Sequence, residues 1–349
     1  MSLNRRQFVA ASAGSALALT SFTRRARAQS GTLRIGVVPF ISSGPFFIAM
    51  AKGYFDAVDI KVEPQTFMDG ALAVPALVAG ELDATVATIN AGLINAVSKG
   101  ANYKLVLDRG SEMVGLGSMT IVASNKMYEA GLTSIDKFDM LEGAKFTIQA
   151  PGGIDQYLLA RGLQNAGLDP TKAAFRAGLT YPDIVKSLGT GLTDVAQIPV
   201  PLAFLAEKNE VGKIIGAGYE IDPGAQLGCF AMPEAFLDED RETAVRYAMA
   251  HIQAAREFVA AAESKDPEVI AIISEATKVP APLVERAAPR WTGYDKDGMP
   301  NVKSCMDQAA FWVDTMKLIS GPVPTEEALF DLSVAEEAAA RLAKENPFL

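Results

Sequence analysis

The segments LVAGELDA at 77–84 and LGTGLTDV at 188–195 share the spacing LxxGxxD and lie 111 positions apart. In both segments the glycine is suited to end a helix, and the aspartate directly precedes a strand-like run. The stretches before the two copies also agree, because each contains a strand-like run, a glycine turn (Gly44 or Gly153) and then a helix-like run. We therefore predict two similar α/β lobes within one chain.

Runs of strand length alternate with helix-like segments in both copies, at 33–38, 60–67, 84–89, 145–150 and 194–198. This alternation favours a mainly parallel sheet covered by helices on both faces. Two extended, glycine-marked segments, 115–125 and 227–233, would carry the chain between the lobes, and two crossings form a hinge. We expect lobe boundaries at 29–116 plus 230–349 and at 117–229, with the helix-rich C-terminal region packed on the lobes.

The N-terminus has the pattern of an export signal over residues 1–28. Arg5 and Arg6 precede an apolar run at 8–19, and small residues follow at the cleavage site. The paired arginines are typical of a twin-arginine signal, although the Sec route stays open. The run is shorter than the roughly 20 apolar residues of a membrane-spanning helix. We therefore expect a soluble periplasmic protein after removal of the signal.

The charge balance argues against polyanionic partners. The full chain carries 32 basic and 41 acidic residues, and removal of the signal leaves 27 basic ones, a net charge of −14. Such a surface repels nucleic acid and anionic lipid. The two cysteines, Cys229 in a strand-like segment and Cys305 in a helix-like one, are expected to be buried thiols. A disulfide stays open for an exported chain.

The residues that usually carry catalysis are sparse. The single histidine, His251, lies in an alanine-rich helix without an evident partner, and we interpret it as a structural or surface residue. One histidine and two distant cysteines do not make a zinc or iron site of ordinary spacing. The hydrolase motif GxSxG and the phosphate loop GxxxxGK[ST] are also missing. We therefore predict no enzyme activity, catalytic residue, metal or cofactor.

Small residues begin a helix directly after a strand in both copies. They are Ser42 and Ser43 in the first copy, and Gly152 and Gly153 in the second. Free backbone N–H groups and the positive ends of the helix dipoles would hold a negatively charged or strongly polar ligand between the lobes. Each turn taken alone is equally a plain helix start.

Further candidate ligand residues follow strand ends. Phe40 and Phe67 would supply apolar walls to a pocket. Thr88 and Asn90 would either donate hydrogen bonds to the ligand or cap the next helix, and we give these interpretations equal weight.

Arg109 is the candidate cation for an anionic ligand. Its guanidinium could pair with a ligand carboxylate or sulfonate. It could also pair with Asp108 or Glu112 at the surface, which is the commoner arrangement for an arginine beside two acids.

Five segments in a fixed order cover most of residues 33–200: LRIGVVP, AKGYFD followed by IKVEP, LVAGELDATVAT, LEGAKFTIQAPGGIDQYLLARGLQNAGLDP and LGTGLTDVAQIP. In this order they resemble periplasmic substrate-binding proteins of ABC importers, in the nitrate, taurine and sulfonate group that includes NMT1/THI5-like proteins. The resemblance implies a two-lobed, hinged type II periplasmic-binding fold that delivers its ligand to an ABC permease in the inner membrane, driven by an ATPase. It also implies that the loops after the strands line the cleft, which adds Ile154 and Pro199 to the candidates.

The expected function is capture of a small organic ligand, anionic and partly apolar or aromatic, by a monomer. Sulfonates, aromatic carboxylates, pyrimidines and nitrate all remain open as ligands. One alternative is an enzyme, because the fungal thiamin-pyrimidine synthases resemble this group. Their active-site histidine and cysteine-rich iron-binding motif are absent from the corresponding region of this chain. The other alternative is a ligand sensor for a membrane partner.

Overall fold

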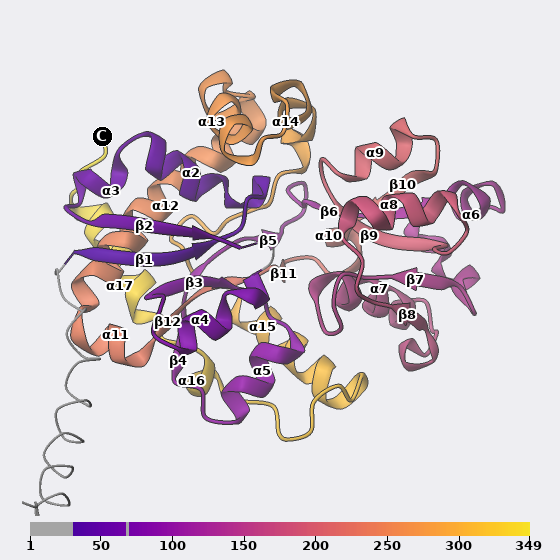
Figure 1. Ribbon diagram of the computed structural model, residues 1–349, viewed down its shortest axis with the longest axis horizontal. Helices are drawn as coiled ribbons and strands as arrows, with labels where there is room; N and C mark the ends of the chain where they lie inside the picture. Colours follow the sequence, from indigo (N-terminus) through magenta and orange to yellow (C-terminus); the bar gives the residue numbers. More distant parts are fainter. Residues whose placement is uncertain (1–30, 68–69) are drawn as a thin grey trace, which may run out of the picture.

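The structure, a computed structural model, describes residues 31–67 and 70–349, so the expected export signal at 1–28 lies outside the described residues. Two five-stranded sheets form the centres of two lobes that lie side by side (Figure 1). We call the part around the sheet β2-β1-β3-β12-β4 lobe 1 and the part around β10-β6-β9-β7-β8 lobe 2. No helix in the described part of the chain is long and apolar enough to cross a membrane.

The sheet of lobe 1 is mainly parallel. β1 pairs in parallel with β2 and β3, whereas β12 lies antiparallel between β3 and β4. Its strands are β1 (Thr32–Val37), β2 (Lys61–Thr66), β3 (Ala84–Ala87), β4 (Tyr103–Asp108) and β12 (Cys229–Pro233).

The sheet of lobe 2 has the same plan. β7 pairs in parallel with β8 and β9, and β6 lies antiparallel between β9 and β10. In both lobes the antiparallel strand is the one that follows a crossing from the other lobe. The matching strand orders confirm the predicted pair of similar α/β lobes. The strands are β6 (Met119–Ser124), β7 (Lys145–Thr147), β8 (Ala174–Arg176), β9 (Val195–Pro199) and β10 (Gly212–Ala217).

Helices cover both sheets, as the alternating pattern predicts. In lobe 1 the N-terminal half supplies η1 (Ile41–Ser43), α2 (Gly44–Ala51), α3 (Tyr54–Ala57), η2 (Gly70–Leu72), α4 (Val74–Val78) and α5 (Ala91–Ser98). Lobe 2 supplies α6 (Asn125–Glu129), η3 (Ile135–Leu141), α7 (Ile154–Asn165), η4 (Pro170–Lys172), α8 (Tyr181–Gly189), α9 (Ala203–Lys208) and α10 (Gly218–Ile221).

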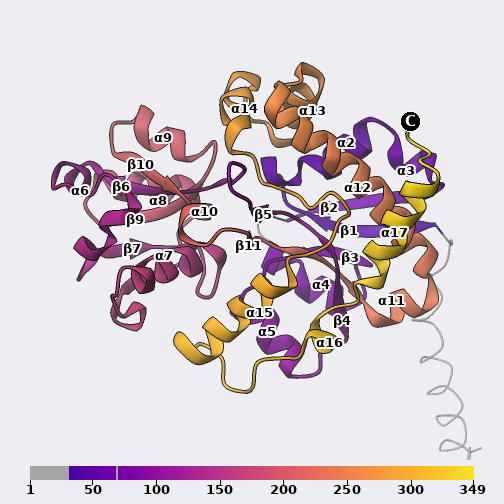
Figure 2. The ribbon, with the colours of Figure 1, turned by 180° about the vertical axis from the view of Figure 1, so that it is seen from behind.

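The C-terminal helices pack on lobe 1 and form no separate domain, as expected from their amphipathic pattern. The long helix α12 contacts α2 and α17, and α17 also contacts β4 (Figure 2). These helices are α11 (Glu234–Glu239), α12 (Arg241–Ser264), α13 (Pro267–Thr277), α14 (Ala281–Ala287), η5 (Ala288–Arg290), α15 (Val302–Ala310), η6 (Phe311–Thr315), α16 (Glu326–Leu329) and α17 (Ser333–Lys344).

Each lobe has its own hydrophobic core. In lobe 1, Ile35 on β1, Ile48 on α2 and Phe258 on α12 are fully buried between the sheet and the helices. In lobe 2, Ile121 on β6 and Leu159 on α7 have the same role. The two clusters centred on lobe 1 also include residues of lobe 2, such as Val200 in one and Tyr157 in the other. Burial of apolar side chains therefore stabilises each lobe and also joins the two lobes.

The repeated LxxGxxD motif joins β3 to β1 in lobe 1 and β9 to β7 in lobe 2. Asp83 donates its N–H to the carbonyl of Arg34 at 2.8 Å, and its carboxylate accepts the N–H of Arg34 at 3.0 Å. Asp194 makes the same pair of bonds with Lys145, at 2.8 and 2.9 Å. A short acidic side chain at this position therefore sets the strand register in both lobes.

The glycines of the motif end the preceding helices. Gly80 and Gly191 have positive φ values of 75° and 73°, a conformation that glycine adopts without steric cost. Their carbonyls accept hydrogen bonds from the side chains of Arg34 and Lys145, each at 3.0 Å. The motif therefore ends a helix and begins a strand in both lobes, which explains why the chain contains it twice.

Replacing Asp83 with alanine is expected to lower the free energy of unfolding by about 2 kcal/mol, because the change removes charge-assisted hydrogen bonds. The buried carboxylate accepts from Arg34 Nε at 2.9 Å and Nη2 at 2.7 Å, besides the backbone bond. Urea unfolding measures the change. The control is Glu63→Ala, which removes an exposed ion pair with Lys61 and should cost less than about 1 kcal/mol. Equal losses in the two variants would contradict this role.

The two crossings between the lobes pair with each other. β5 (Ser111–Glu112) and β11 (Ala225–Gln226) form a two-stranded antiparallel ribbon that belongs to neither large sheet. The ribbon lies between the lobes in both views (Figures 1 and 2). The ribbon precedes the segments predicted as crossings, 115–125 and 227–233, most of which form β6 and β12 of the two large sheets. The two crossings are hydrogen-bonded to each other as one unit.

The two cysteines are free thiols, in agreement with the interpretation favoured from the sequence. Cys229 lies on β12 and Cys305 on α15, and both are buried. Burial and the neighbouring Cys305 thiol raise the pKa of Cys229, which keeps it protonated.

Candidate functional site

A cavity of about 250 Å³ lies between the two lobes and is lined mainly by loops that follow strands. Lobe 1 and the C-terminal region contribute Val38, Pro39, Phe40, Ile41, Ser42, Gly70, Val86, Thr88, Arg109, Leu227, Thr277 and Val279. Lobe 2 and the segment leading into it contribute Ser118, Met119, Gln149, Ile154, Tyr181, Pro199, Val200, Pro201 and Leu202.

The cavity is formed where equivalent loops of the two repeats meet. Three pairs of lining residues lie 111 positions apart, as the motif aspartates do: Val38 with Gln149, Gly70 with Tyr181, and Thr88 with Pro199. The lobes therefore present matching loops to a shared space, and a ligand in it would contact both.

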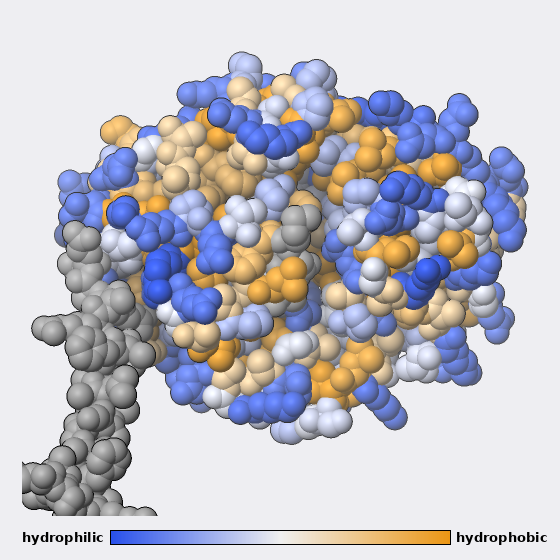
Figure 3. All heavy atoms as spheres, in the orientation of Figure 1, coloured by the Kyte–Doolittle hydropathy of each residue, from blue (hydrophilic) through white to orange (hydrophobic). Residues whose placement is uncertain are grey.

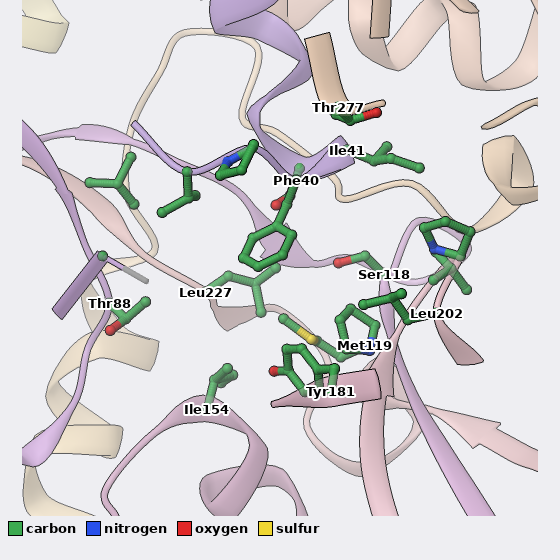
Figure 4. Close-up of a pocket in the computed structure, with 18 of the residues that line it drawn as sticks. Phe40, Ile41, Thr88, Ser118, Met119, Ile154, Tyr181, Leu202, Leu227 and Thr277 are labelled. Atoms are coloured by element: carbon green, nitrogen blue, oxygen red, sulfur yellow. The ribbon is translucent and has the colours of Figure 1, made fainter. Parts of the chain in front are cut away.

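Six of the eleven residues predicted from the sequence line this cavity: Phe40, Ser42, Thr88, Arg109, Ile154 and Pro199. Figure 4 shows the ring of Phe40 directed into the middle of the space, near Leu227 and Met119. Ile154 approaches from the start of α7 on the opposite side. The two helix starts identified in the sequence thus border the same cavity.

Three predicted residues of lobe 1 lie beside the cavity without lining it. Ser43 is buried, and its hydroxyl accepts a hydrogen bond from Arg109 Nη2 at 3.3 Å. Phe67 packs against a hydrophobic cluster of lobe 1. Asn90 caps α5, because its side-chain oxygen accepts the N–H of Leu93 at 2.8 Å. Ligand contact and helix capping had equal weight for Thr88 and Asn90. In the structure Thr88 lines the cavity and Asn90 caps a helix.

Gly152 and Gly153 also lie outside the lining. Their N–H groups donate to Gln156 Oε1 at 2.7 Å and to the carbonyl of Ala150 at 3.3 Å, so neither is available to a ligand in this arrangement. Gly152 instead contacts the other lobe, where its carbonyl accepts the N–H of Ala91 at 3.3 Å. This turn therefore joins the two lobes, and its local sequence does not indicate that contact.

Arg109 is the only formally charged side chain that lines the cavity within the described part of the chain. It is 6% exposed, so it does not lie at the surface, where the alternative interpretation expected it. The carboxylates of Asp108 and Glu112 are engaged elsewhere. Asp108 accepts hydrogen bonds from the Gly110 N–H at 2.7 Å and from Gln226 Nε2 at 2.7 Å. Burial raises the pKa of Asp108 to about 6.

The neighbours of Arg109 form a buried polar layer behind the cavity. His251 Nε2 lies 3.1 Å from the carbonyl of Asp108, and its ring packs against Tyr294. Burial, reinforced by the charge of Arg109, lowers the pKa of His251 to about 3, so the imidazole is neutral near pH 7. The Tyr294 hydroxyl donates to the carbonyl of Ser42. His251 is thus a structural residue, as expected from the sequence.

The sequence missed several lining residues of the hinge and the second lobe, and others of lobe 1 and the C-terminal region, such as Val38 and Val279. Ser118 and Met119 lie at the first crossing, which the sequence identified only as a hinge segment. Gln149 and Tyr181 could have been found by adding the repeat offset to Val38 and Gly70. Met119, Tyr181 and Leu202 lie on the same side of the cavity in Figure 4.

The lobes also touch at a second place, between α14 of lobe 1 and α9 of lobe 2. Arg286 Nη2 lies 3.2 Å from Glu207 Oε2, and the guanidinium lies 4.1 Å from the centre of the Phe204 ring. A furrow separates the lobes on the face shown in Figure 3. The lobes are thus in contact at separate points, including the Ala91–Gly152 bond.

A search of residues 31–67 and 70–349 finds no group of three or more histidine, cysteine, aspartate or glutamate residues that could hold a metal ion. The polar side chains of the cavity wall instead carry hydroxyl, amide and guanidinium groups, at Ser42, Thr88, Arg109, Ser118, Gln149, Tyr181 and Thr277. Such groups can donate hydrogen bonds to an anion.

A family model described as the NMT1-like family matches residues 26–274 of the chain. Over 234 residues the chain is 23% identical to the nitrate import ATP-binding protein NrtC of Synechococcus elongatus. The match covers 66% of this chain and 35% of that protein, so the chain spans about a third of the length of the curated relative it matches.

Solved structures show the same fold. The periplasmic nitrate-binding protein NrtA from Synechocystis PCC 6803 has a TM-score of 0.71 at 16% identity, over 90% of this chain and 89% of that one. The alkanesulfonate-binding protein SsuA from Xanthomonas axonopodis pv. citri, bound to MOPS, has a TM-score of 0.68 at 17% identity, over 87% and 99%. The predicted two-lobed periplasmic-binding fold is therefore confirmed.

Proposed function

The chain belongs to the NMT1-like family, and on that premise we propose that it is an exported solute-binding component of an ABC importer. It captures a small organic anion between its two lobes. The observation that carries the proposal is the cavity between equivalent loops of both lobes, with the buried Arg109 in its wall. The guanidinium in the wall can form charge-assisted hydrogen bonds with the carboxylate or sulfonate oxygens of a ligand.

The size of the cavity favours an organic ligand over a bare inorganic ion. Its volume of about 250 Å³ exceeds the roughly 150 Å³ of an apolar cavity that holds benzene, whereas a water molecule occupies about 30 Å³ in the liquid. Nitrate would leave most of this space empty. Phe40, Met119, Ile154 and Leu202 supply apolar walls, so the body of the ligand is apolar or aromatic.

Capture would occur by closure of the lobes about the hinge ribbon. We propose that the moving parts are 29–116 with 230–349 and 117–229. This division is supported by β6 to β10, which all belong to lobe 2, and by β12, which returns to the sheet of lobe 1. A ligand that contacts both lobes stabilises the closed arrangement by its differential affinity for it.

The proposed partners are an ABC permease in the inner membrane and its ATPase, to which a monomer would deliver the ligand after export by the signal at 1–28. The similarity to a nitrate import ATP-binding protein and to periplasmic binding proteins supports this assignment. The chain has no proposed cofactor or catalytic role.

A thermal-shift screen of the mature chain tests the proposal. The probes are aromatic carboxylates, alkyl and aryl sulfonates, aminopyrimidines and nitrate. A ligand at 100 times its dissociation constant adds about 2.7 kcal/mol to the free energy of unfolding. We expect the organic anions to raise the melting temperature and nitrate to have little effect. A screen without any stabilising anion would refute the proposed ligand class, and chemical conversion of a bound ligand would favour the enzyme alternative.

A further inference from the structure

Glu112 occupies an unusual position, at the centre of the hinge ribbon and with no exposed surface. It pairs with Ala225 across the ribbon, and its carbonyl accepts the N–H of Gly224 at 2.7 Å. Its main chain therefore joins the first crossing to the second. It does not line the ligand cavity.

The side chain of Glu112 is enclosed by backbone of the first crossing and of lobe 2. Oε1 accepts the N–H of Met119, the first residue of β6, at 3.1 Å. A β-carbon added to Gly117 or to Gly218 would lie 2.5 or 2.6 Å from Oε2, so only glycine leaves room for this carboxyl group. The side chain thus contacts the first crossing where it enters lobe 2 and the start of α10 in lobe 2.

The contacts of Glu112 extend to the cavity wall through its neighbours. Met119 lines the cavity, and so does Ser118, whose hydroxyl accepts a hydrogen bond from Thr292 at 2.8 Å. The carboxyl group therefore fixes the segment that presents two cavity residues, without itself touching the cavity.

No described lysine or arginine contributes to the titration of Glu112. Burial raises its pKa to about 8, against the opposing effect of the backbone N–H groups of Met119, Ser118 and Tyr219. This pKa lies above the ordinary value of 4.5. The stabilising contribution of the protonated group is therefore complete below about pH 4.5, and it is lost as the pH rises through about 8.

The other titratable groups around the hinge are directed away from Glu112. Glu220 on α10 accepts the N–H of Ala217 at 3.0 Å, and Asp222 accepts the hydroxyl of Tyr157 at 2.7 Å. Asp108 on β4 is hydrogen-bonded to Gln226 and to the Asp295 N–H. Tyr219 packs its ring beside Gly117.

We propose that Glu112 is a positioning residue of the hinge: its protonated carboxyl group holds the first crossing against α10 of lobe 2 in the arrangement that brings the lobes together, and its ionisation releases the crossing. A buried carboxylate without a counter-charge is costly, so ionisation favours a hinge arrangement in which water reaches the group. This inference rests on the proposed function, because it concerns how the lobes close over a ligand.

Spin labels on the two lobes of the ligand-free chain test the proposal. Val78→Cys in lobe 1 and Leu192→Cys in lobe 2 place labels on side chains that are 63% and 51% exposed, whereas the native Cys229 and Cys305 are buried. We expect a narrow distance distribution at pH 6 and a broader distribution with a longer mean at pH 9.5. The same labels on Glu112→Gln should give the pH 6 distribution at both pH values, because glutamine cannot ionise. Glu220→Gln, the neighbouring control, should keep the wild-type response.

A wild-type distribution that does not change between pH 6 and pH 9.5 would overturn the proposal, and this test does not depend on the folding of any variant at position 112. An equal pH response in wild type and Glu112→Gln would also overturn it. Urea midpoints give a second readout, which should fall between these pH values in wild type and stay constant in Glu112→Gln. Because no ligand is used, failure of the ligand screen leaves this measurement intact, and a negative result here leaves the proposed ligand site standing.

Discussion

Replacing Arg109 with alanine is expected to weaken binding of the anionic ligand by at least about 30-fold, because removing one member of a buried charged pair costs about 2 to 5 kcal/mol. The guanidinium lines the cavity and is almost fully buried. Without it, the ligand anion would be enclosed among apolar walls with no opposite charge. Calorimetric titration with an anion identified in the screen measures the loss.

Two further variants separate the effect of charge from that of shape. Arg109→Lys keeps the positive charge but loses the planar fork of donors, so it should restore only part of the affinity. Arg161→Ala removes an arginine of α7 that bonds Gln164 at the surface, and it should leave binding unchanged. Wild-type affinity in Arg109→Ala would show that the anionic group of the ligand lies elsewhere.

Gly152→Ala is expected to weaken ligand binding by roughly tenfold or more, because it keeps the lobes apart. A β-carbon at this position would lie 2.5 Å from the β-carbon of Ala91 and 3.0 Å from its nitrogen, both on the other lobe. The hydrogen bond between the Ala91 N–H and the Gly152 carbonyl would be lost as well. Loss of one interlobe contact of about 1.4 kcal/mol corresponds to a tenfold change in affinity. Calorimetric titration and the interlobe spin-label distance measure the effect.

The matched control for this variant is Gly143→Ala. Gly143 has a φ of 74°, nearly equal to the 75° of Gly152, but a β-carbon there meets nothing within 4 Å. Placing alanine at positive φ should therefore destabilise both variants by a similar amount, about 1 to 2 kcal/mol. Only Gly152→Ala creates a clash between the lobes. Adding Ala91→Gly to Gly152→Ala should restore part of the affinity. Equal affinities in the two single variants would contradict a role for Gly152 in closure.

Three of the predicted residues that line the cavity, Phe40, Thr88 and Pro199, lie at or just after strand ends, and parallel strands present those ends to the same edge of a sheet. Val38 and Gln149 also follow strands and line the cavity, and they were not predicted. Other candidates lie outside the lining, where their polar groups have local partners. Asn90 caps its own helix, and the Gly152 N–H bonds the side chain of Gln156. A cap forms between residues that are close in the chain, so its side-chain and N–H groups are already hydrogen-bonded and are not available to a ligand.

Arg109 shows the opposite kind of failure. The acids on either side of it made a surface ion pair the favoured interpretation, yet Asp108 accepts a hydrogen bond from Gln226 and Arg109 is buried. No local pattern specifies that Gln226 returns from the second crossing to Asp108.

The sequence by itself determined the two lobes, because the effects of the LxxGxxD motif depend on the conformation and hydrogen bonds of its own residues. A glycine at positive φ ends a helix, and an aspartate beside it bonds the neighbouring strand at 83 and at 194. Only the tertiary structure decided that β6 and β12 insert into the sheets across the hinge, that Glu112 of the first crossing pairs with Ala225 of the second, and that Gly152 meets Ala91. These features depend on how the two lobes pack against each other, and that packing is set by contacts between residues far apart in the chain.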